Sequence, residues 1–355
     1  MAVPLCQYYS RCQGCSLQYV EYAQQLENKQ RRVCTAVGLS TIEVFSAESY
    51  HYRNRLELFW NGTSLCLRGE KGKLIPVARC VIAEEKINVL IAEINAFFVG
   101  KGEFQGVVLR TTTTASSISF VRADVSEKFM KEVQPFTLQS AADNIIVTCT
   151  DDFYGSEYSV VKGNDYLKEE IMGKQFIFPV QGFFQNNTKM MLKMQEYVQS
   201  LLQKYPTHKA ELLDLYSGVG TFGIINAELF QKVTLVENFK PAIEMAQKNL
   251  EWNEIKNGKA FVLAGGQIGR LKFSSLLYVI ADPPRVGMEE KAIIELNRLK
   301  PEVIVYISCN LEQLKKDLPK FKSYKVKSAA LFDLFPQTNH MEVVVELVRE
   351  STFSK

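Results

Sequence analysis

A glycine-rich turn between an apolar run and a helix-like segment constrains the fold of this chain more than any other feature. The apolar run at 212–215 leads into a turn that contains Gly218 and Gly220, and a helix-like segment follows at 221–230. Glycine permits a sharp turn and a close approach of the backbone to a ligand, which a Cβ atom would prevent. Strand-like and helix-like segments then alternate to about residue 320. This alternation predicts an α/β fold with a Rossmann-like sheet.

An acidic residue after the next strand-like run indicates what this turn binds. The run at 232–236 ends in Glu237, about 20 residues after the turn, where a carboxylate can accept both ribose hydroxyls of an adenosine. No basic residue is evident that would read the 2′-phosphate of a dinucleotide. We therefore expect S-adenosylmethionine, a nucleoside cofactor without a pyrophosphate, rather than NAD. The alternative is a structural left-handed turn that binds nothing.

A thiol, a rigid turn and a carboxylate follow at the ends of later strand-like runs. Cys309 comes directly after the apolar run at 303–307, Asp282 opens an Asp-Pro-Pro-Arg turn, and Glu342 lies at the start of the last run. Three such groups at strand ends can form one site on an α/β sheet. Arg285 stands where methyltransferases of exocyclic amino groups carry an aromatic residue, which argues against amino methylation. The alternative for Cys309 is a buried structural cysteine.

Five motifs together resemble the RNA uracil-C5 methyltransferase family, and the resemblance covers essentially the whole chain. They occur in the order typical of the family: Phe183-Phe184-Gln185-Asn186-Asn187, the turn at 214–220, Asp282-Pro283-Pro284-Arg285, Ser308-Cys309-Asn310 and His340-Met341-Glu342. The resemblance implies a class I methyltransferase domain that uses S-adenosylmethionine. Four residues would contact this cofactor: Gln185, Tyr216, Glu237 and Asp282.

The same resemblance implies the roles of the reacting groups. Cys309 would add to C6 of the uracil, which makes C5 nucleophilic, and Glu342 would then remove the C5 proton. His340 is an alternative base. Phe183 is a candidate for packing against a uracil flipped out of its stack, with simple core packing as the alternative.

Half of the eight cysteines form a second pattern near the N-terminus. Cys6, Cys12 and Cys15 lie close together in the sequence, and Cys80 is the expected fourth member, far along the chain. Cys66 is the alternative to Cys80. Four thiolates suit a [4Fe–4S] cluster or a structural zinc ion, and disulfides are not expected in a reduced compartment. Members of the family with similar spacing carry [4Fe–4S], so the resemblance favours iron–sulfur.

Periodicity divides the 355 residues into three parts. We expect an N-terminal iron–sulfur segment with a helix at 1–49, a central α+β domain that contacts RNA at 50–180, and the methyltransferase domain at 181–355. The last two strands, at 324–332 and 341–348, should form a hairpin at the sheet edge. No apolar run reaches the roughly 18 residues of a membrane span. We expect a cytoplasmic monomer with no protein partner.

The substrate expected from these features is RNA. The net charge of +3 is too small to identify a nucleic-acid partner, but Arg53, Asn54 and Arg55 lie beside Tyr50 and Tyr52 in a segment suited to single-stranded RNA. The cysteines, and the lack of an RNA-binding TRAM barrel before them, resemble the RlmC branch, which implies 23S rRNA as the substrate. A uridine in the tRNA T loop is the alternative substrate. A non-catalytic RNA-binding iron–sulfur protein is the alternative from a different class.

Overall fold

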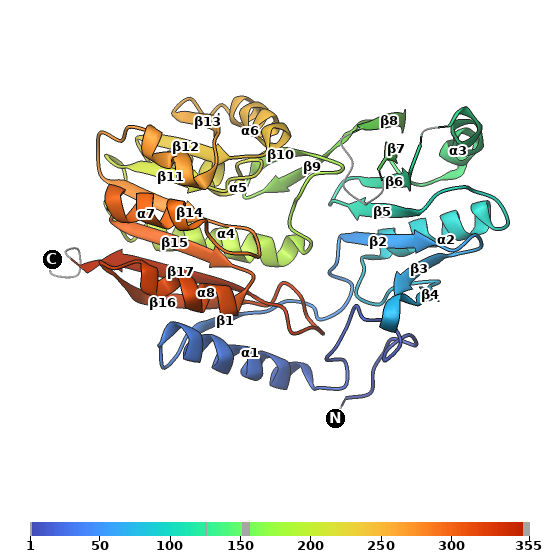
Figure 1. The fold of residues 1–355 in the computed structure, drawn as a ribbon, viewed down its shortest axis with the longest axis horizontal. Coiled ribbons are helices and arrows are strands. Elements are labelled where there is room, and N and C mark those ends of the chain that lie inside the picture. The colour runs from blue at the N-terminus through green and yellow to red at the C-terminus, as the bar shows by residue number, and fades with distance from the viewer. Residues whose placement is uncertain (1, 125, 151–156, 351–355) are drawn as a thin grey trace.

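Two mixed sheets form the two halves of the computed structural model, which describes residues 2–124, 126–150 and 157–350. The larger sheet has eight strands in the order β1-β16-β17-β15-β14-β11-β12-β13, and the smaller has seven in the order β4-β3-β2-β5-β6-β7-β8. Figure 1 shows the two sheets side by side, with the chain crossing between them more than once. None of the helices in these ranges is long and apolar enough to cross a membrane.

The larger sheet is built mainly from parallel strands whose side chains are buried on both faces. Strands β13, β12, β11, β14 and β15 are parallel, whereas β17 runs antiparallel between β15 and β16. Such strands are near-continuous apolar runs because helices cover both faces of the sheet. The strands are β1 (Glu43–Phe45), β11 (Glu211–Leu215), β12 (Lys232–Glu237), β13 (Gly258–Val262), β14 (Leu277–Ala281), β15 (Val303–Ser308), β16 (Tyr324–Phe332) and β17 (Glu342–Arg349).

Helices pack against each face of this sheet and define two apolar cores. Neighbouring residues of one strand enter different cores: Leu212 packs with α4, α5 and α6, whereas Leu213 packs with α1, α7 and α8. The helices are α1 (Tyr22–Val37), α4 (Thr188–Leu202), α5 (Thr221–Ile225), α6 (Lys240–Trp252), α7 (Glu290–Leu299) and α8 (Leu311–Asp317). This is the α/β fold that the alternating pattern predicted.

The smaller sheet holds its own core against two helices. Its strands are β2 (Arg55–Trp60), β3 (Leu65–Arg68), β4 (Leu74–Pro76), β5 (Gly106–Thr111), β6 (Ser116–Arg122), β7 (Asn144–Cys149) and β8 (Glu157–Lys162). Helices α2 (Glu85–Phe98) and α3 (Glu127–Gln139) contribute a cluster of phenylalanines that includes Phe98, Phe129 and Phe136. A separate two-stranded ribbon of β9 (Tyr166–Ile171) and β10 (Lys174–Pro179) precedes α4.

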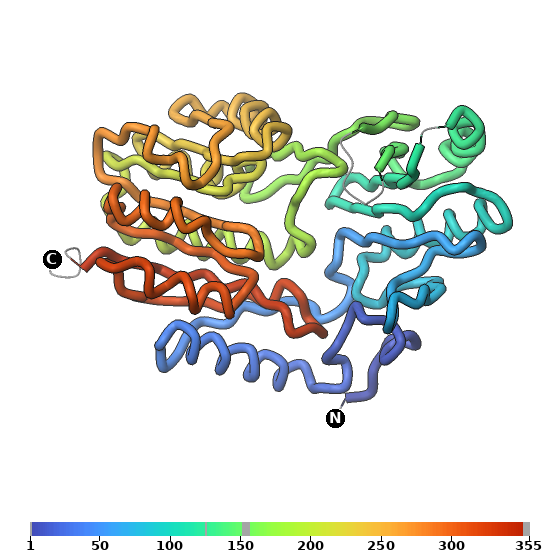
Figure 2. Tube along the Cα trace, in the orientation of Figure 1, coloured from blue at the N-terminus to red at the C-terminus, as the bar shows by residue number. Residues whose placement is uncertain are grey.

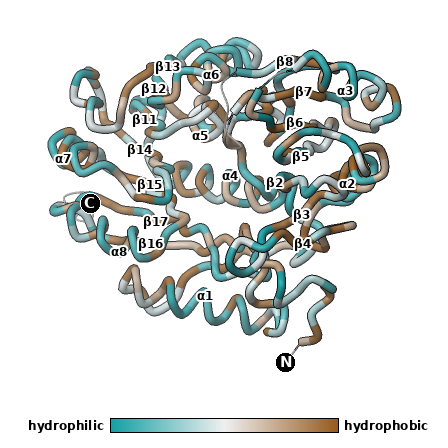
Figure 3. Tube along the Cα trace, turned by 45° about the vertical axis from the view of Figure 1, so that its right-hand side comes forward, coloured by the Kyte–Doolittle hydropathy of each residue, from teal (hydrophilic) through white to brown (hydrophobic). Residues whose placement is uncertain are grey.

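The N-terminal region is shared between the two halves, which the sequence did not predict. Cys12 forms an isolated bridge with Gly69 beside the smaller sheet, whereas α1 and β1 pack on the larger one. Figure 2 traces this blue segment past the smaller sheet and then beneath the red C-terminal strands. Figure 3 shows hydrophilic and hydrophobic residues mixed along α1, and its buried residues recur every four positions (Gln25, Lys29, Val33 and Val37), so one side of the helix is buried.

One expectation about the sheet edge was wrong. The hairpin of β16 and β17 forms, but β1 pairs in parallel with β16 and therefore occupies the edge. The three residues of β1 are too few to show a period of two.

The loop at 333–341, which leads into β17, is anchored by α1. The Nζ atom of Lys29 lies 2.6 Å from Oδ1 of Asp333, and both side chains are buried. The Nε2 atom of Gln25 donates to Oε1 of Gln337 at 2.9 Å. Removing one partner of a buried ion pair leaves an unpaired charge in the interior, which strongly destabilises the fold. These contacts fix the path of the chain toward the start of β17.

Candidate active site

One cavity gathers all six residues that the sequence predicted for the active site. Its volume is about 620 Å³, and it opens where the carboxyl ends of β11, β12, β14 and β15 meet the start of β17. Loops at strand ends form a ligand site of this kind in open α/β sheets. The predicted residues on its wall are Gln185, Tyr216, Glu237, Asp282, Cys309 and Glu342.

The glycine-rich turn adopts a backbone that side chains rarely permit. Gly218 and Gly220 have φ values of 54° and 89°. A Cβ atom on Gly220 would lie 2.8 Å from Cδ1 of Leu235, so glycine is required there for space as well as for conformation. The turn therefore brings its backbone against the cavity, as the sequence indicated.

Backbone N–H groups orient the carboxylate of Glu237. Its Oε1 atom accepts from the N–H groups of Asn238 and Phe239 at 2.8 and 2.9 Å, and its Oε2 atom accepts from Gly218 at 3.3 Å. A carboxylate offers about four lone-pair sites, so Oε1 is fully used and Oε2 has one site left for a further donor. This arrangement holds the carboxylate at the cavity wall with Oε2 able to accept a ligand hydroxyl group.

The hydroxyl of Tyr216 already has a partner within the protein. Tyr216 has a φ of 63°, and its hydroxyl accepts from the backbone N–H of Glu289 at 3.3 Å. Burial raises the pKa of this hydroxyl above its ordinary value. Tyr216 thus supports the loop after Asp282 through its hydroxyl group. The residue also lines the active-site cavity.

Gln185 lies on a loop that is tied to the smaller sheet through Asn54. The Nδ2 atom of Asn54 donates to the carbonyl oxygen of Gln185 at 3.1 Å and to Oγ1 of Thr188 at 3.0 Å. Asn54 is only 4% exposed. Of the segment expected to contact RNA, this residue therefore faces inward, while Arg53 and Arg55 line a neighbouring cavity.

The Cys309 thiol lies beside two carboxyl groups. Burial, followed by the charges of Glu342 and Asp282, raises the pKa of Cys309 to about 12, while Arg285 acts in the opposite direction. Arg285 favours the thiolate, but burial and the carboxylates outweigh its effect, so the resting cysteine is a neutral thiol at pH 7.

The two carboxyl groups also perturb each other. Burial raises the pKa of Asp282 to about 7, and burial together with the charge of Asp282 raises the pKa of Glu342 well above its ordinary value. Like charges that are buried together cannot both ionise at low cost. The pair therefore holds a proton near neutral pH and can take up or release one there. His340 is not among the residues on the wall of this cavity, and burial with nearby cations lowers its pKa.

The profile of the family described as tRNA (uracil-5-)-methyltransferase matches residues 21–350. The chain belongs to this family. A tRNA (uracil(54)-C(5))-methyltransferase of Pyrococcus horikoshii is 31% identical over 97% of this chain and 85% of that protein. The enzyme of the same description from Pyrococcus abyssi is 28% identical over 97% and 86% of the two chains.

A solved structure has the same fold throughout. The crystal structure of the Pyrococcus abyssi tRNA (uracil-54, C5)-methyltransferase in complex with S-adenosyl-L-homocysteine gives a TM-score of 0.79. It is 26% identical and covers 97% of this chain and 88% of that chain. The protein is thus an S-adenosylmethionine-dependent RNA uracil-C5 methyltransferase with the class I fold.

The four N-terminal cysteines of the methyltransferase share a second cavity, of about 800 Å³. Its wall includes Cys6, Cys12, Cys15 and Cys80. Within residues 2–124, 126–150 and 157–350, however, no group of three or more cysteine, histidine or acidic side chains is arranged to hold a metal ion. Four cysteines are chemically suited to bind a cluster through their thiolates. Their geometry in this structure does not form the expected iron–sulfur site. Cys66 is not on this wall, and its Sγ atom contacts the carbonyl oxygen of Ser64.

The sequence missed an aromatic residue on the cofactor side of the active-site cavity. Phe239 lies two residues after Glu237, lines the cavity and is 54% exposed. A large exposed apolar ring beside a cavity suits stacking on a flat ligand. The position of Phe239 just after Glu237, the acidic residue that ends β12, was the sequence feature that could have identified it.

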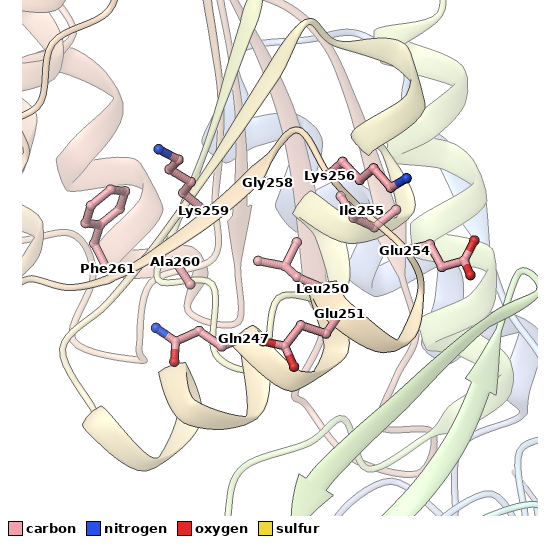
Figure 4. Close-up of a pocket in the computed structure, with 10 residues that line it drawn as sticks. All are labelled: Gln247, Leu250, Glu251, Glu254, Ile255, Lys256, Gly258, Lys259, Ala260 and Phe261. Atoms are coloured by element: carbon pink, nitrogen blue, oxygen red, sulfur yellow. The ribbon is translucent and has the colours of Figure 1, made fainter.

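A third cavity, shown in Figure 4, lies between the C-terminal part of α6 and the edge strand β13. Its volume is about 630 Å³, and its wall includes Glu251, Glu254, Lys256 and Lys259. None of the predicted site residues is among the residues that line it. It therefore contributes nothing to the active site of the methyltransferase.

Asp214 is a further buried carboxyl group beneath the glycine-rich turn. It is 1% exposed, and its Oδ2 atom accepts from the N–H of Gly223 at 2.7 Å. Its Oδ1 atom has no hydrogen-bond partner in the part of the chain that the structure describes. Burial, with smaller contributions from Asp282 and Glu237, raises the pKa of Asp214 to about 7. The ionised form is therefore disfavoured in the folded protein.

This burial predicts a pH-dependent difference in stability between the native chain and Asp214→Asn. The folded state binds the Asp214 proton more tightly than the unfolded state, so this carboxyl group destabilises the native chain as pH rises from about 4 through about 7. The limiting effect is on the order of 4 kcal/mol. In thermal unfolding at pH 5 and pH 8, the native chain should lose more stability than the asparagine variant. Equal losses in both proteins would show that Asp214 is not protonated in the fold.

Proposed function

We propose that this methyltransferase modifies C5 of a uridine in the T loop of tRNA, with Cys309 as the nucleophile and Glu342 as the base. The observation that carries the chemistry is the shared cavity in which Cys309, Asp282 and Glu342 face the same space as Gln185 and Glu237. A nucleophile, a proton acceptor and a cofactor wall are the parts that such a reaction requires.

The choice of tRNA rests on the relatives. Those described above from Pyrococcus horikoshii and Pyrococcus abyssi are tRNA enzymes, and they align with nearly the whole chain. They support the tRNA alternative better than our first expectation of 23S rRNA.

The raised pKa values suit the first step, the addition of the cysteine to C6. The neutral Cys309 thiol must lose its proton as sulfur adds, and an ionised carboxylate of the Asp282–Glu342 pair can accept it. Addition to C6 moves electron density onto C5 and O4 of the ring. C5 would then accept the methyl group of bound S-adenosylmethionine, whose S–CH3 bond would break to leave S-adenosylhomocysteine.

The second half of the reaction requires an ionised base near C5, so the carboxyl pair, which now carries two protons, first releases one to solvent. Glu342 then takes the remaining proton from C5, the electrons of that bond restore the C5–C6 double bond, and the C6–S bond to Cys309 breaks. The departing sulfur recovers a proton from the carboxyl pair, which returns to its resting state with one proton. Residues of the cofactor wall have a positioning role: Gln185, Tyr216, Glu237 and Asp282 would bind S-adenosylmethionine, with Phe239 beside its adenine.

The target uridine must leave its stack to reach Cys309. Phe183 is 73% exposed and lines both the active-site cavity and the cysteine cavity. It can therefore support the flipped base or fill the gap that the base leaves. Arg53 and Arg55 line the cysteine cavity together with this ring and are the candidates for contacts with the neighbouring phosphates, although Arg55 also pairs with Glu57.

We also propose that Cys6, Cys12, Cys15 and Cys80 hold a [4Fe–4S] cluster. All four thiols face one cavity, and burial raises the pKa of Cys15 to about 12, which metal binding would reverse. Phe183 lines both the cysteine cavity and the active-site cavity, so a cluster here would lie beside the approach to the RNA site.

Replacement of Cys309 by alanine should abolish covalent trapping of a tRNA T-loop transcript that carries 5-fluorouridine. The native enzyme and a Cys34→Ala control should both form a protein–RNA species that survives denaturing electrophoresis. Binding of S-adenosylhomocysteine should change less than about twofold, because no bond to the cofactor is removed. Trapping by the alanine variant would exclude Cys309 as the nucleophile. Trapping with a 23S rRNA fragment but not with tRNA would contradict the proposed substrate.

Replacement of Glu342 by glutamine should stall the enzyme after methyl transfer. With unmodified tRNA, a covalent species should accumulate and turnover should fall by about 10²- to 10⁴-fold, because the C5 proton has no acceptor. His340→Ala is the matched control and should retain turnover. The opposite result, in which the histidine variant accumulates the adduct, would make His340 the base.

The cysteine proposal predicts iron in anaerobically purified protein. We expect about four iron atoms and as many labile sulfides per chain, with the broad absorbance of a [4Fe–4S] cluster. Cys15→Ser should lose the iron, whereas Cys66→Ser should retain it. Colourless protein that contains one zinc ion per chain would contradict the assignment.

A further inference from the structure

The loop between β10 and α4 has to be held in place from outside, because it contains no regular secondary structure. It spans residues 180–187 and carries both Phe183 and Gln185. Figure 1 shows the chain passing between the two sheets on its way from β10 to α4. Fixing the backbone of each loop residue costs roughly 1–2 kcal/mol of conformational entropy. Contacts with neighbouring elements must offset that cost.

A buried arginine on β5 makes two of these contacts. The Nη1 atom of Arg110 donates to the carbonyl oxygen of Gly182 at 2.7 Å, and its Nη2 atom donates to that of Phe184 at 3.4 Å. Arg110 is 2% exposed. The two carbonyl groups belong to the residues on either side of Phe183. One guanidinium group thus binds the backbone on both sides of the exposed Phe183 ring.

Aromatic packing holds the guanidinium group itself. Arg110 lies over the ring of Phe178, with its Cζ atom 5.3 Å from the centroid. The rings of Phe178 and Phe184 are stacked, with centroids 3.9 Å apart and planes 7° from parallel. Phe184 therefore points into the core while Phe183 points out. The planar, forked shape of arginine is required for this arrangement, and a lysine cannot reproduce it.

The strand next to β5 completes the attachment. Arg55 of β2 pairs with Arg110 of β5, and the preceding residue, Asn54, bonds to the backbone of Gln185 and Asn186. Arg110 of β5 and Asn54, which directly precedes β2, thus fix four positions of the loop, 182, 184, 185 and 186, on both sides of Phe183. The ring is left free to meet a ligand, while its backbone is not free to move.

We infer that Arg110 is a positioning residue for RNA methylation. It holds Phe183 at the junction of the two cavities and keeps Gln185 at the cofactor wall. The inference rests on the proposed roles of Phe183 and Gln185. The smaller sheet contributes no reacting group, but through Arg110 it would set the position of the flipped uridine relative to the methyl donor.

Arg110→Lys and Arg110→Met test this inference, with Arg122→Met as the matched control. Arg122 is a similarly buried arginine on the neighbouring strand β6, lies over Phe129 and donates to Asp124 and Ser126 at the start of α3. We expect kcat/KM for tRNA to fall roughly tenfold or more in Arg110→Met, in line with the loss of a charge-assisted hydrogen bond. Arg110→Lys should recover part of this loss, and Arg122→Met should remain within about twofold of native.

Hydrogen exchange separates positioning from general stability. The amides of residues 182–187 should exchange faster in both Arg110 variants, while amides of β11 and β15 should exchange at the native rate. Arg122→Met should leave the loop protected. Uniformly faster exchange across the chain, with no excess at the loop, would overturn the inference. If Arg110→Met does not fold, the lysine variant alone decides between these outcomes.

A double-variant cycle with Phe183→Ala shows whether Arg110 acts through this ring. If it does, adding Arg110→Met to Phe183→Ala should lower kcat/KM for tRNA by much less than it does in the native background. Full additivity of the two losses would contradict the inference. If Phe183→Ala alone leaves kcat/KM for tRNA unchanged, the proposed role of Phe183 is wrong, whereas faster loop exchange in the Arg110 variants would still stand.

Discussion

The close burial of a thiol with two carboxyl groups is the constraint on which the active site depends. Cys309, Asp282 and Glu342 come from three different strand ends; the two carboxyl groups raise the free energy of ionising Cys309, and Asp282 raises that of Glu342. The fold supports this only because parallel strands are held rigidly from both faces by helices. The result is a site whose protons are exchangeable near neutral pH, which suits a reaction that removes one proton from sulfur and another from carbon.

The two sheets have different tasks, and hydrogen bonds to irregular loops connect them. The larger sheet supplies the reacting groups, while the smaller sheet holds the loop that carries Phe183 and Gln185 through Asn54 and Arg110. On the opposite side, the loop before Glu342 is held by α1. The groups that we propose to meet one flipped base are thus fixed by contacts from distant parts of the chain, as pre-organised sites require.

Much of the site could be predicted because the ends of buried strands can be recognised in the sequence. Apolar runs followed by Gly218, Asp282 and Cys309 marked the strand ends, and parallel strands place such ends at one edge of the sheet. Side-chain direction could not be predicted in the same way. Asn54 lies between two arginines and was expected to contact RNA, yet it turns inward because loop carbonyl groups need donors. The edge strand β1 was missed because its pairing with β16 links residues nearly 300 positions apart.

We propose that this enzyme forms 5-methyluridine in the tRNA T loop. Mass-spectrometric mapping of 5-methyluridine in tRNA and rRNA tests this directly, in cells with the gene, in cells without it, and in cells that carry only the Cys309→Ala form. The T-loop modification should disappear in the second and third cases, while 23S rRNA should be unchanged. Loss of 5-methyluridine from 23S rRNA with intact tRNA would contradict it.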